Sequence, residues 1–435
     1  MCSQNSQTSI EELSIKEIEA FQNQKLQLQL EYLAEHSAFY QRMFSQHNID
    51  WKTITSVKDL GLVPVTTKND LQQYNHDFLC VPQTEIIDYS TTSGTLGDPV
   101  TFGLTDKDLD RLATNEMNSF QRIGVQKGDV VQLMTTIDRR FMAGLAYFLG
   151  LRKIGAGVIR IGAGVPQLQW DSILKYQPKY LVAVPSFLLK MLDYAEKNNI
   201  DYQNSSVKAV LCIGESLRDK ELNSSLLTQK INSKWDIQLF STYASTEMGT
   251  AFTECDESVG GHHQPDLIIT EILDENNEVV EDGELGELTI TTLGIEGMPL
   301  LRFKTGDLLR KHSGKCKCGS NSYRLGPVEG RKQHMIKYKG TTLYPPALHD
   351  ILNHFDEIKL HLIEIYSNEF GTDEILIRLV STDETDDFLA KIKDYFRAKL
   401  RVTPSIKFET FEELQPIVFK PESRKPITFI DYRES

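Results

Sequence analysis

The stretch Ser90–Pro99, which reads STTSGTLGDP, combines hydroxyl side chains and glycines at a density suited to holding phosphate groups. Glycine lets backbone N–H groups approach an anion closely and adopt positive φ, while Ser93 and Thr95 can donate hydroxyl hydrogen bonds to phosphate oxygens. The stretch lacks the Gly-Lys-Ser/Thr ending of the common P-loop, and a polar turn between two strands is the alternative interpretation. The residue types therefore favour a nucleotide-binding loop over other sites.

Three cysteines and a histidine form a second group with chemical potential. Cys255 and His262 lie in ECDESVGGHH, and Cys316 and Cys318 lie in the turn-rich segment CKCG. Three thiols and one imidazole are a usual ligand set for tetrahedral Zn²⁺, and His263 is an alternative imidazole. Because the four residues fill all four positions, the predicted zinc site is structural; buried or free thiols are the alternative.

Composition narrows the class of partner. The 435 residues are 40% hydrophobic and 25% charged, as in an ordinary globular protein, and the formal net charge is −14. This charge argues against nucleic acid or an anionic membrane as the main partner, although a small anion can still be held locally. The N-terminus has no basic region followed by an apolar core, and the apolar run at 141–151 is too short to span a bilayer. With six cysteines in no regular framework, we expect a cytoplasmic protein.

These residues must be positioned by an α/β fold. Residues 9–46 are amphipathic and predict N-terminal helical structure. From Asp129 onward short apolar runs alternate with helical patterns: VVQLM, FMAGLAYFLGL, GVIRI, YLVAV, SFLLKMLDYA and AVLCI. This βαβα alternation predicts a largely parallel sheet with helices on its faces, and the later strands LIITEIL and GELTITT predict antiparallel pairing.

The pattern changes after Gly330. A hairpin (QHMIKYKGTTLY), a helix (PALHDILNHF), two strands (HLIEIYS and EILIRLVS) and a second helix (DDFLAKIKDYFRAKL) predict a small α+β module. The sequence thus predicts a large α/β domain over residues 1–328, with mixed and parallel sheets and helices, and a small C-terminal α+β domain over 329–435. The cleft between two such domains is a favoured place for a ligand.

Four further segments complete a motif series with the opening stretch: CIGES at 212–216, YASTE at 243–247, LLRFKTGDL at 300–308 and EGRKQHMIKYKG at 329–340. In this order the series resembles that of the adenylate-forming acyl-CoA synthetases, and most closely the phenylacetate-CoA ligase branch. The resemblance extends over nearly the whole chain. It implies a large adenylation domain and a small mobile C-terminal lid, and it implies that a carboxylate attacks the α-phosphorus of ATP before a thiol displaces AMP.

The resemblance also implies roles for individual residues. Glu247 would bind Mg²⁺, as a carboxylate is the hard oxygen donor that this ion prefers, and Asp307 would accept from the ribose hydroxyls. Arg331 would reach the ribose or the phosphate. The remaining nucleotide-binding residues are the pyrophosphate loop Thr92, Ser93, Gly94, Thr95 and Gly97, the purine slot Gly214 and Glu215, the adenine-stacking Tyr243, and Ala244, Ser245 and Thr246 of the same segment. Taken singly, Tyr243 could instead be core packing, Glu247 a helix N-terminal charge and Asp307 a turn former.

The C-terminal tail FKPESRKPITFIDYR resembles the family segment that carries the adenylation lysine. Alignment on Ile430 and Asp431 places that lysine at Lys425, with Lys420 as the alternative. Its ammonium would stabilise the charge that develops between the attacking carboxylate and the α-phosphate. The ECDESVGGHH and CKCG segments likewise resemble those of a subset of this branch in which the set binds zinc.

The sequence departs from the family pattern in three places. Asp98 stands where the phosphate loop usually has lysine, and Gln333 and His334 replace the paired aspartates of the hinge. By resemblance the acyl pocket lies along 135–150 and at Ile213, where the charged run 138–140 (Asp-Arg-Arg) replaces small and aromatic residues.

We therefore expect a homodimeric enzyme that takes ATP, Mg²⁺, coenzyme A and an aromatic or similar small carboxylic acid, and that carries structural zinc. Two alternatives remain open. One is an adenylating enzyme that delivers its acyl or AMP group to a protein thiol or a coenzyme hydroxyl. The other is a nucleotide-binding homologue that has lost catalysis.

Overall fold

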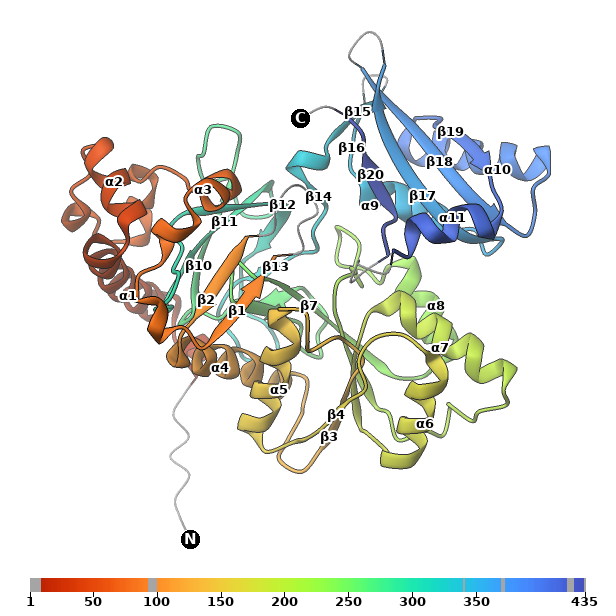
Figure 1. Ribbon diagram of the computed structural model, residues 1–435, viewed down its shortest axis with the longest axis horizontal. Helices are drawn as coiled ribbons and strands as arrows, with labels where there is room; N and C mark the ends of the chain where they lie inside the picture. The colour runs from red at the N-terminus through yellow and green to blue at the C-terminus, as the bar shows by residue number, and fades with distance from the viewer. Residues whose placement is uncertain (1–8, 93–99, 339–340, 369–371, 421–425, 434–435) are drawn as a thin grey trace. The chain divides into compact units, whose positions relative to one another are not determined.

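The computed structural model describes residues 9–92, 100–338, 341–368, 372–420 and 426–433. The chain divides into two compact units (Figure 1). Unit 1 comprises Met1–Thr305 and Leu309–Pro327, and unit 2 comprises Gly306–Leu308 and Val328–Ser435. No helix in the part of the chain that the structure describes is long and apolar enough to cross a membrane.

Local sequence signals define the helices of unit 1. Ser14 and Glu17 form a capping box at the start of α1, Pro166 and Pro185 occupy the first turns of α6 and α7, and Gly155 ends α5 in the left-handed region. The helices are α1 (Ile15–His36), α2 (Ala38–Gln46), α3 (Lys68–Gln73), α4 (Asp106–Arg122), α5 (Met142–Ile154), α6 (Pro166–Tyr176), α7 (Pro185–Lys197) and α8 (Leu226–Lys234). Short 3₁₀ helices lie at Ile10–Glu12, Trp51–Thr53, Val57–Leu62, Asn75–Phe78 and Gln83–Glu85.

A large mixed sheet forms the centre of unit 1. Its strand order is β10-β11-β12-β13-β9-β8-β7-β6-β5-β3-β4, and β1 and β2 form a separate antiparallel hairpin. The strands are β1 (Asp88–Thr91), β2 (Thr101–Leu104), β3 (Val130–Leu133), β4 (Gly157–Arg160), β5 (Tyr180–Ala183), β6 (Ala209–Cys212), β7 (Gln238–Ser245), β8 (Thr250–Thr253), β9 (Gly261–His262), β10 (Ile268–Leu273), β11 (Leu285–Thr292), β12 (Phe303–His312) and β13 (Arg324–Leu325).

The pairing of these strands confirms the predicted α/β class. Strands β4, β3, β5, β6 and β7 are parallel, and β10 and β11 are antiparallel. The N-terminal helical stretch is interrupted at Ser37, which accepts a hydrogen bond from Tyr40 N and so begins α2 as a separate helix. The parallel strands and their crossover helices meet the βαβ expectation because each buried strand is followed by a helix that covers one face.

Alternate residues of the parallel strands enter two separate cores. Leu181 of β5 and Val210 of β6 pack with α6, α7 and α8, whereas Val182 and Leu211 pack with α4 and α5 on the other face. Side chains on a strand alternate between faces, so two hydrophobic layers form on one sheet. This double burial makes the strands rigid supports for the residues that follow their carboxyl ends.

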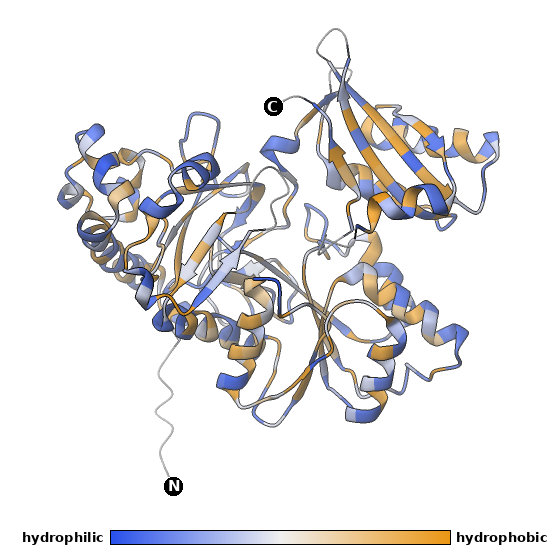
Figure 2. Cartoon of the chain, viewed as in Figure 1, coloured by the Kyte–Doolittle hydropathy of each residue, from blue (hydrophilic) through white to orange (hydrophobic). Residues whose placement is uncertain are grey.

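Unit 2 is built on an antiparallel and parallel sheet of order β19-β18-β17-β20. Ile363, Ile365 and Ile377 face a core with α9 and α10, and Leu362 faces α11 on the other side. Figure 2 shows the hydrophobic residues that run along β17 and β18. The elements are β14 (Gly330–Arg331), β15 (Ile336–Tyr338), β16 (Thr341–Leu343), α9 (Pro345–Asn353), β17 (Ile358–Ser367), β18 (Asp373–Ser381), α10 (Asp386–Leu400), β19 (Ser405–Phe408), α11 (Phe411–Val418) and β20 (Phe429–Asp431), with a 3₁₀ turn at Lys332–His334.

Candidate active site

Two of the predicted nucleotide-binding segments emerge side by side from the parallel sheet of unit 1. Strands β6 and β7 are parallel neighbours, with Cys212 opposite Ser241. The purine-slot residues follow β6 directly, and Gly214 adopts φ +77°, a conformation that favours glycine. Residues 243–247 lie further along β7, past the part that pairs with β6, and in the turn that follows β7. Ligands of open α/β sheets bind outside the carboxyl ends of the strands, which is where both segments lie.

A tight turn between β7 and β8 presents Glu247. Ser245 accepts hydrogen bonds at its carbonyl from Gly249 N (3.3 Å) and at Oγ from Met248 N (3.3 Å). Gly249 has φ +51° and completes the reversal into the antiparallel strand β8. Glu247 is partly exposed and lies in no helix, so the helix-terminal alternative for this carboxylate is excluded.

Tyr243 is neither fully buried nor fully exposed. It lies opposite Phe252 in the β7–β8 register, and the two ring centroids are 6.2 Å apart with an interplanar angle of 30°. Phe252 is completely buried. The inner neighbour therefore fixes the Tyr243 ring while part of its surface stays accessible to a planar ligand, an arrangement compatible with stacking on a base.

The carboxylate of Glu215 has a structural partner. Its two oxygens accept from Ser186 N (2.8 Å) and Ser186 Oγ (2.7 Å) in the first turn of α7. A carboxylate at a helix N-terminus satisfies N–H groups that lack intrahelical partners and complements the helix dipole. The side chain of Glu215 thus joins the β6 loop to α7, which the sequence motif did not reveal.

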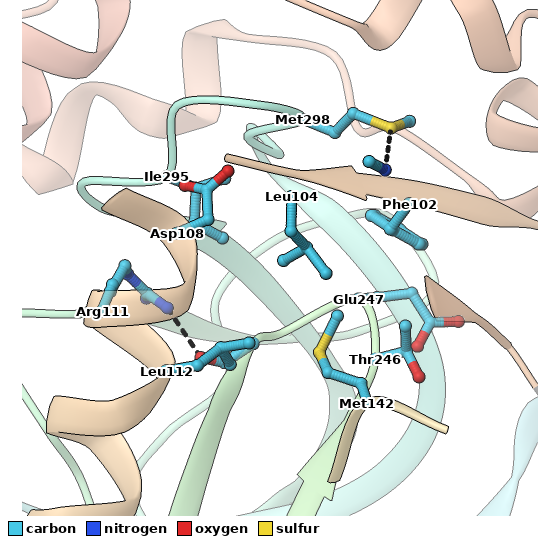
Figure 3. Close-up of a pocket in the computed structure, with 12 residues that line it drawn as sticks. Phe102, Leu104, Asp108, Arg111, Leu112, Met142, Thr246, Glu247, Ile295 and Met298 are labelled. Atoms are coloured by element: carbon cyan, nitrogen blue, oxygen red, sulfur yellow. Dashed lines mark hydrogen bonds between the residues drawn. The ribbon is translucent and has the colours of Figure 1, made fainter. Parts of the chain in front are cut away.

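Glu247 also borders a small cavity in unit 1 (Figure 3). The cavity, of about 20 Å³, is large enough for one water molecule. Phe102, Leu104, Leu112, Met142, Ile295 and Met298 supply its apolar wall. Behind the turn, α4 contributes Asp108 and Arg111, and both side chains are buried.

Sequence reasoning missed these two α4 residues. The signal that could have found them is spacing, because Asp108, Arg111 and Asn115 recur at helical intervals on one face of a capped helix. Asp108 accepts from Glu296 N (2.7 Å) and Gly297 N (2.8 Å), and so ties α4 to the loop that closes the cavity.

The structure describes only the first three residues of the phosphate-loop stretch, Ser90–Thr92, and then Val100, the residue that follows it. Thr92 is buried and exchanges two hydrogen bonds with Val100: Thr92 N donates to Val100 O (3.0 Å), and Val100 N donates to Thr92 Oγ1 (3.1 Å). These bonds hold Thr92 and Val100 together at the end of the β1–β2 hairpin. The predicted loop residues Ser93, Gly94, Thr95 and Gly97, with Asp98, lie outside the described residues.

Unit 2 brings Asp307 and Arg331 together. They are paired across β12 and β14, and Arg331 Nε donates to Asp307 Oδ1 at 2.9 Å. Asp307 is buried and lies within a strand, so it is not a turn former; the turn-like conformation belongs to Gly306, with φ +80°. A carboxylate only accepts hydrogen bonds, which is the chemistry that ribose hydroxyl donors require.

The C-terminal residues used to place the adenylation lysine belong to β20. This strand pairs in parallel with β17, with Glu364 opposite Ile430 and Ile365 opposite Asp431. The alternative Lys420 is exposed just beyond α11, whereas Lys425 lies outside the described residues.

The four predicted zinc ligands converge in unit 1. The ligand atoms of Cys255, His262, Cys316 and Cys318 all lie within 4.8 Å of one another. Cys255 Sγ is 3.7 Å from Cys316 Sγ, and His262 Nε2 is 3.3 Å from Cys255 Sγ and 3.7 Å from Cys318 Sγ. Around a tetrahedral zinc, Zn–S bonds of about 2.3 Å and a Zn–N bond of about 2.0 Å place neighbouring ligand atoms about 3.5–3.8 Å apart. The three separations lie within about 0.2 Å of these values, so the four residues are arranged in a way that is compatible with a zinc ion.

The protonation and the contacts of His262 and His263 decide which imidazole belongs to this cluster. Burial is the main cause that lowers the pKa of His262, to about 3, so its imidazole is neutral as a metal ligand must be. His263, the alternative ligand, turns away: its Nε2 lies 2.6 Å from Ile268 O, and its ring stacks on Tyr323 at 4.2 Å. The imidazole that the structure brings to the thiols is thus that of His262.

Comparisons with known proteins identify the family. Residues 55–296 match the family model of AMP-binding enzymes. The chain is 25% identical over 426 residues to the phenylacetate-coenzyme A ligase of Thermus thermophilus, covering 91% of this chain and 94% of the relative. It is 27% identical over 366 residues to that of Pseudomonas putida, covering 82% and 81% respectively.

A solved structure extends the likeness to the fold. The 2-hydroxyisobutyryl-CoA ligase in its postadenylation state matches with a TM-score of 0.84 at 22% identity, over 99% of this chain and 94% of that one. The chain belongs to the family of AMP-binding enzymes. It is similar to the phenylacetate-coenzyme A ligases, which confirms the resemblance seen in its motifs and supports an AMP-forming acyl-CoA ligase.

Proposed function

We propose that the protein activates an aromatic or similar small carboxylic acid with ATP and transfers the acyl group to coenzyme A, with release of AMP and pyrophosphate. The observation that carries this proposal is the convergence of Gly214 and the 243–247 segment at the carboxyl edge of the parallel sheet, in a chain of the AMP-binding family. The proposed domains are an adenylation domain over 1–328 and a lid over 329–435.

Each proposed role follows from the local chemistry. Glu247 offers a hard oxygen donor from a rigid turn, so it would hold Mg²⁺, which neutralises pyrophosphate charge when bound. Tyr243 would stack on the adenine, while Ala244, Ser245 and Thr246 line the same edge. Because the Glu215 carboxylate is engaged by Ser186, the backbone of Gly214 and Glu215 is the part of that segment that would face the purine.

The phosphates and ribose would be bound by the remaining motif residues. Thr92, Ser93, Gly94, Thr95 and Gly97 would enclose the departing pyrophosphate with N–H and hydroxyl donors. Asp307 would accept from the ribose hydroxyls, and its ion pair with Arg331 would hold both side chains in place. Lys425 would place its ammonium against the charge that develops during carboxylate attack.

The proposal includes one structural zinc ion held by Cys255, His262, Cys316 and Cys318. The donor set and the 3.3–3.7 Å separations between ligand atoms support this assignment. Four protein ligands leave no open coordination position, so the ion would stabilise the fold and take no part in the reaction. We also propose a cytoplasmic protein, in keeping with the absence of disulfide bonds among the cysteines that the structure describes, and, by resemblance to the family, a homodimer.

The decisive experiment is carboxylate-dependent ATP–pyrophosphate exchange across a panel of aromatic and small aliphatic acids, followed by thioester formation with coenzyme A. Exchange with at least one acid, and thioester formation with it, supports the proposal. Exchange without transfer to coenzyme A would favour another acceptor, and absence of exchange with every acid would favour a homologue that has lost catalysis.

The adenylation lysine is tested in the same assay. We expect Lys425→Ala to abolish exchange, because the developing negative charge loses its cation, while thioester formation from supplied acyl-adenylate persists. Lys420→Ala is the matched control and should leave exchange intact. Equal loss of both half-reactions in Lys425→Ala, or loss of exchange only in Lys420→Ala, would contradict the assignment.

A further inference from the structure

Helix α4 carries a buried guanidinium behind the turn that presents Glu247. The Arg111 side chain donates from Nε to Leu293 O (2.7 Å) and from Nη1 to Gly249 O (2.6 Å). Its Nη2 donates to Leu267 O (2.6 Å) and Thr250 Oγ1 (3.0 Å). One planar group thus joins α4 to the β7–β8 turn, to the residue after β11 and to the residue before β10, a fork that a lysine cannot reproduce.

The contact with Gly249 is close as well as polar. A Cβ atom at Gly249 would lie 3.4 Å from Arg111 Nη1, and the backbone of this glycine is in the left-handed region. Gly249 ends the turn that begins at Ser245, and Glu247 lies between them. Arg111, Thr246, Glu247 and Gly249 border the same cavity (Figure 3). The guanidinium therefore sets the position of one end of the turn that carries Glu247.

Burying this cation is costly, which argues that its hydrogen bonds matter. Burial is the main cause that lowers the pKa of Arg111, to about 10, so the guanidinium remains charged at neutral pH. Its direct acceptors are three carbonyls and one hydroxyl, and the nearby carboxylates of Asp108 and Asp266 only partly offset the burial. A buried cation with several hydrogen-bonded partners holds them in a narrow range of geometries.

We propose that Arg111 is a positioning residue for the Mg²⁺ carboxylate Glu247, acting through the carbonyl of Gly249. This inference rests on the proposed function. It assigns to α4, which contains none of the recognised motifs, the task of holding the β7–β8 turn where its carboxylate can meet the metal bound to ATP.

The test is the Mg²⁺ dependence of ATP–pyrophosphate exchange in Arg111→Lys. Removal of a partner that orients a metal ligand weakens metal affinity by about tenfold or more, so the Mg²⁺ concentration for half-maximal exchange should rise by about tenfold. Thioester formation from supplied acyl-adenylate, which forms no pyrophosphate, should keep its rate. A loss of stability alone would not move the Mg²⁺ requirement in the folded fraction.

Arg302→Lys is the matched control. Arg302 is also buried and donates to Val63 O (2.7 Å), Asn277 O (3.0 Å) and Glu271 Oε1 (3.2 Å), none of which belongs to the β7–β8 turn. We expect it to lower the melting temperature while leaving the Mg²⁺ requirement unchanged. Equal shifts in both variants, or no shift in folded Arg111→Lys, would overturn the proposal.

A milder variant tests the role of Arg111 if Arg111→Lys does not fold. Thr250→Val removes only the hydroxyl acceptor of Nη2 and keeps the shape of a buried side chain. A smaller increase in the Mg²⁺ requirement supports the proposal, and an unchanged requirement overturns it. Failure of the proposed function is separate, because it appears as absence of exchange in the unaltered protein.

Discussion

Unit 1 contains two proposed metal sites, which differ in the type and number of their protein ligands. The Cys255–His262–Cys316–Cys318 cluster collects four soft or borderline donors whose atoms lie within 4.8 Å of one another. The β7–β8 turn offers the single hard carboxylate of Glu247 from a partly exposed position. A structural ion needs all its ligands from the protein, whereas Mg²⁺ in phosphoryl chemistry takes one or two carboxylates and completes its sphere with phosphates and water.

The two sites are also supported differently. The cysteine-rich segment is fastened to the N-terminus of the described chain, where Asn321 N donates to Glu11 O (2.7 Å) and Asn321 Nδ2 donates to Glu12 O (2.9 Å). The Glu247 turn is held by Arg111 of α4, which donates a hydrogen bond to the carbonyl of Gly249. The first arrangement joins distant parts of the fold, and the second holds one side chain in place. Loss of the first should therefore damage stability, and loss of the second should damage catalysis.

The largest expected effect is that of Cys316→Ser. Loss of one thiolate should abolish stoichiometric zinc and lower the free energy of unfolding by more than about 4 kcal/mol, since a structural zinc site contributes folding free energy directly. Metal analysis of protein purified without added zinc, with thermal unfolding, measures both. Cys80→Ser, at a buried cysteine outside the cluster, is the control and should leave the zinc content unchanged. Unaltered zinc content in Cys316→Ser would contradict the proposed zinc site.

Glu247→Gln tests the proposed Mg²⁺ ligand on the β7–β8 turn. The amide keeps the size of the side chain but loses the charge that Mg²⁺ requires, so exchange should fall by about 100-fold or more. Because the turn is partly exposed, stability should change by less than about 0.5 kcal/mol. Exchange kinetics and thermal unfolding on the same preparation distinguish these effects. A stable variant with normal exchange would exclude Glu247 as the metal ligand.

Glu215→Gln should have the smallest effect and sharpens the contrast between carboxylates. Glu215 lies at the same sheet edge as Glu247, but its oxygens accept from Ser186 at the start of α7. The variant should lose about 0.5–1 kcal/mol of stability through the weaker interaction with the helix dipole. The KM for ATP should stay within about twofold, because the proposed contact with the purine uses backbone atoms and keeps its full binding energy. A much larger rise in KM would assign the carboxylate itself to the nucleotide.

Periodicity predicted the parallel strands that lead to the candidate site, but it did not predict β7 and β8, whose connecting turn carries Glu247. The apolar runs at β3, β5 and β6 form fully or largely buried strands. A short apolar run between two helical patterns indicates such a strand. Short elements such as β9 and β13 were not predicted, because two-residue strands are defined by pairing partners and carry no period of their own. Helix α4 was not singled out, since polar residues interrupt its buried apolar face and the partners of Asp108 and Arg111 are mostly backbone atoms far away in sequence.

The sequence by itself determined the family, the order of the motifs and the three cysteines of the candidate zinc site with two candidate imidazoles, because each depends on residue type and spacing. Only the tertiary structure decided that His262 and not His263 meets the thiols, that Asp307 pairs with Arg331 within strands, and that the Glu215 carboxylate caps α7. It alone revealed Arg111 behind the Glu247 turn. The physical reason is the same in each case: hydrogen-bond partners and ligand separations depend on which backbone segments the packed sheet brings together, and no local pattern of residues encodes that distance.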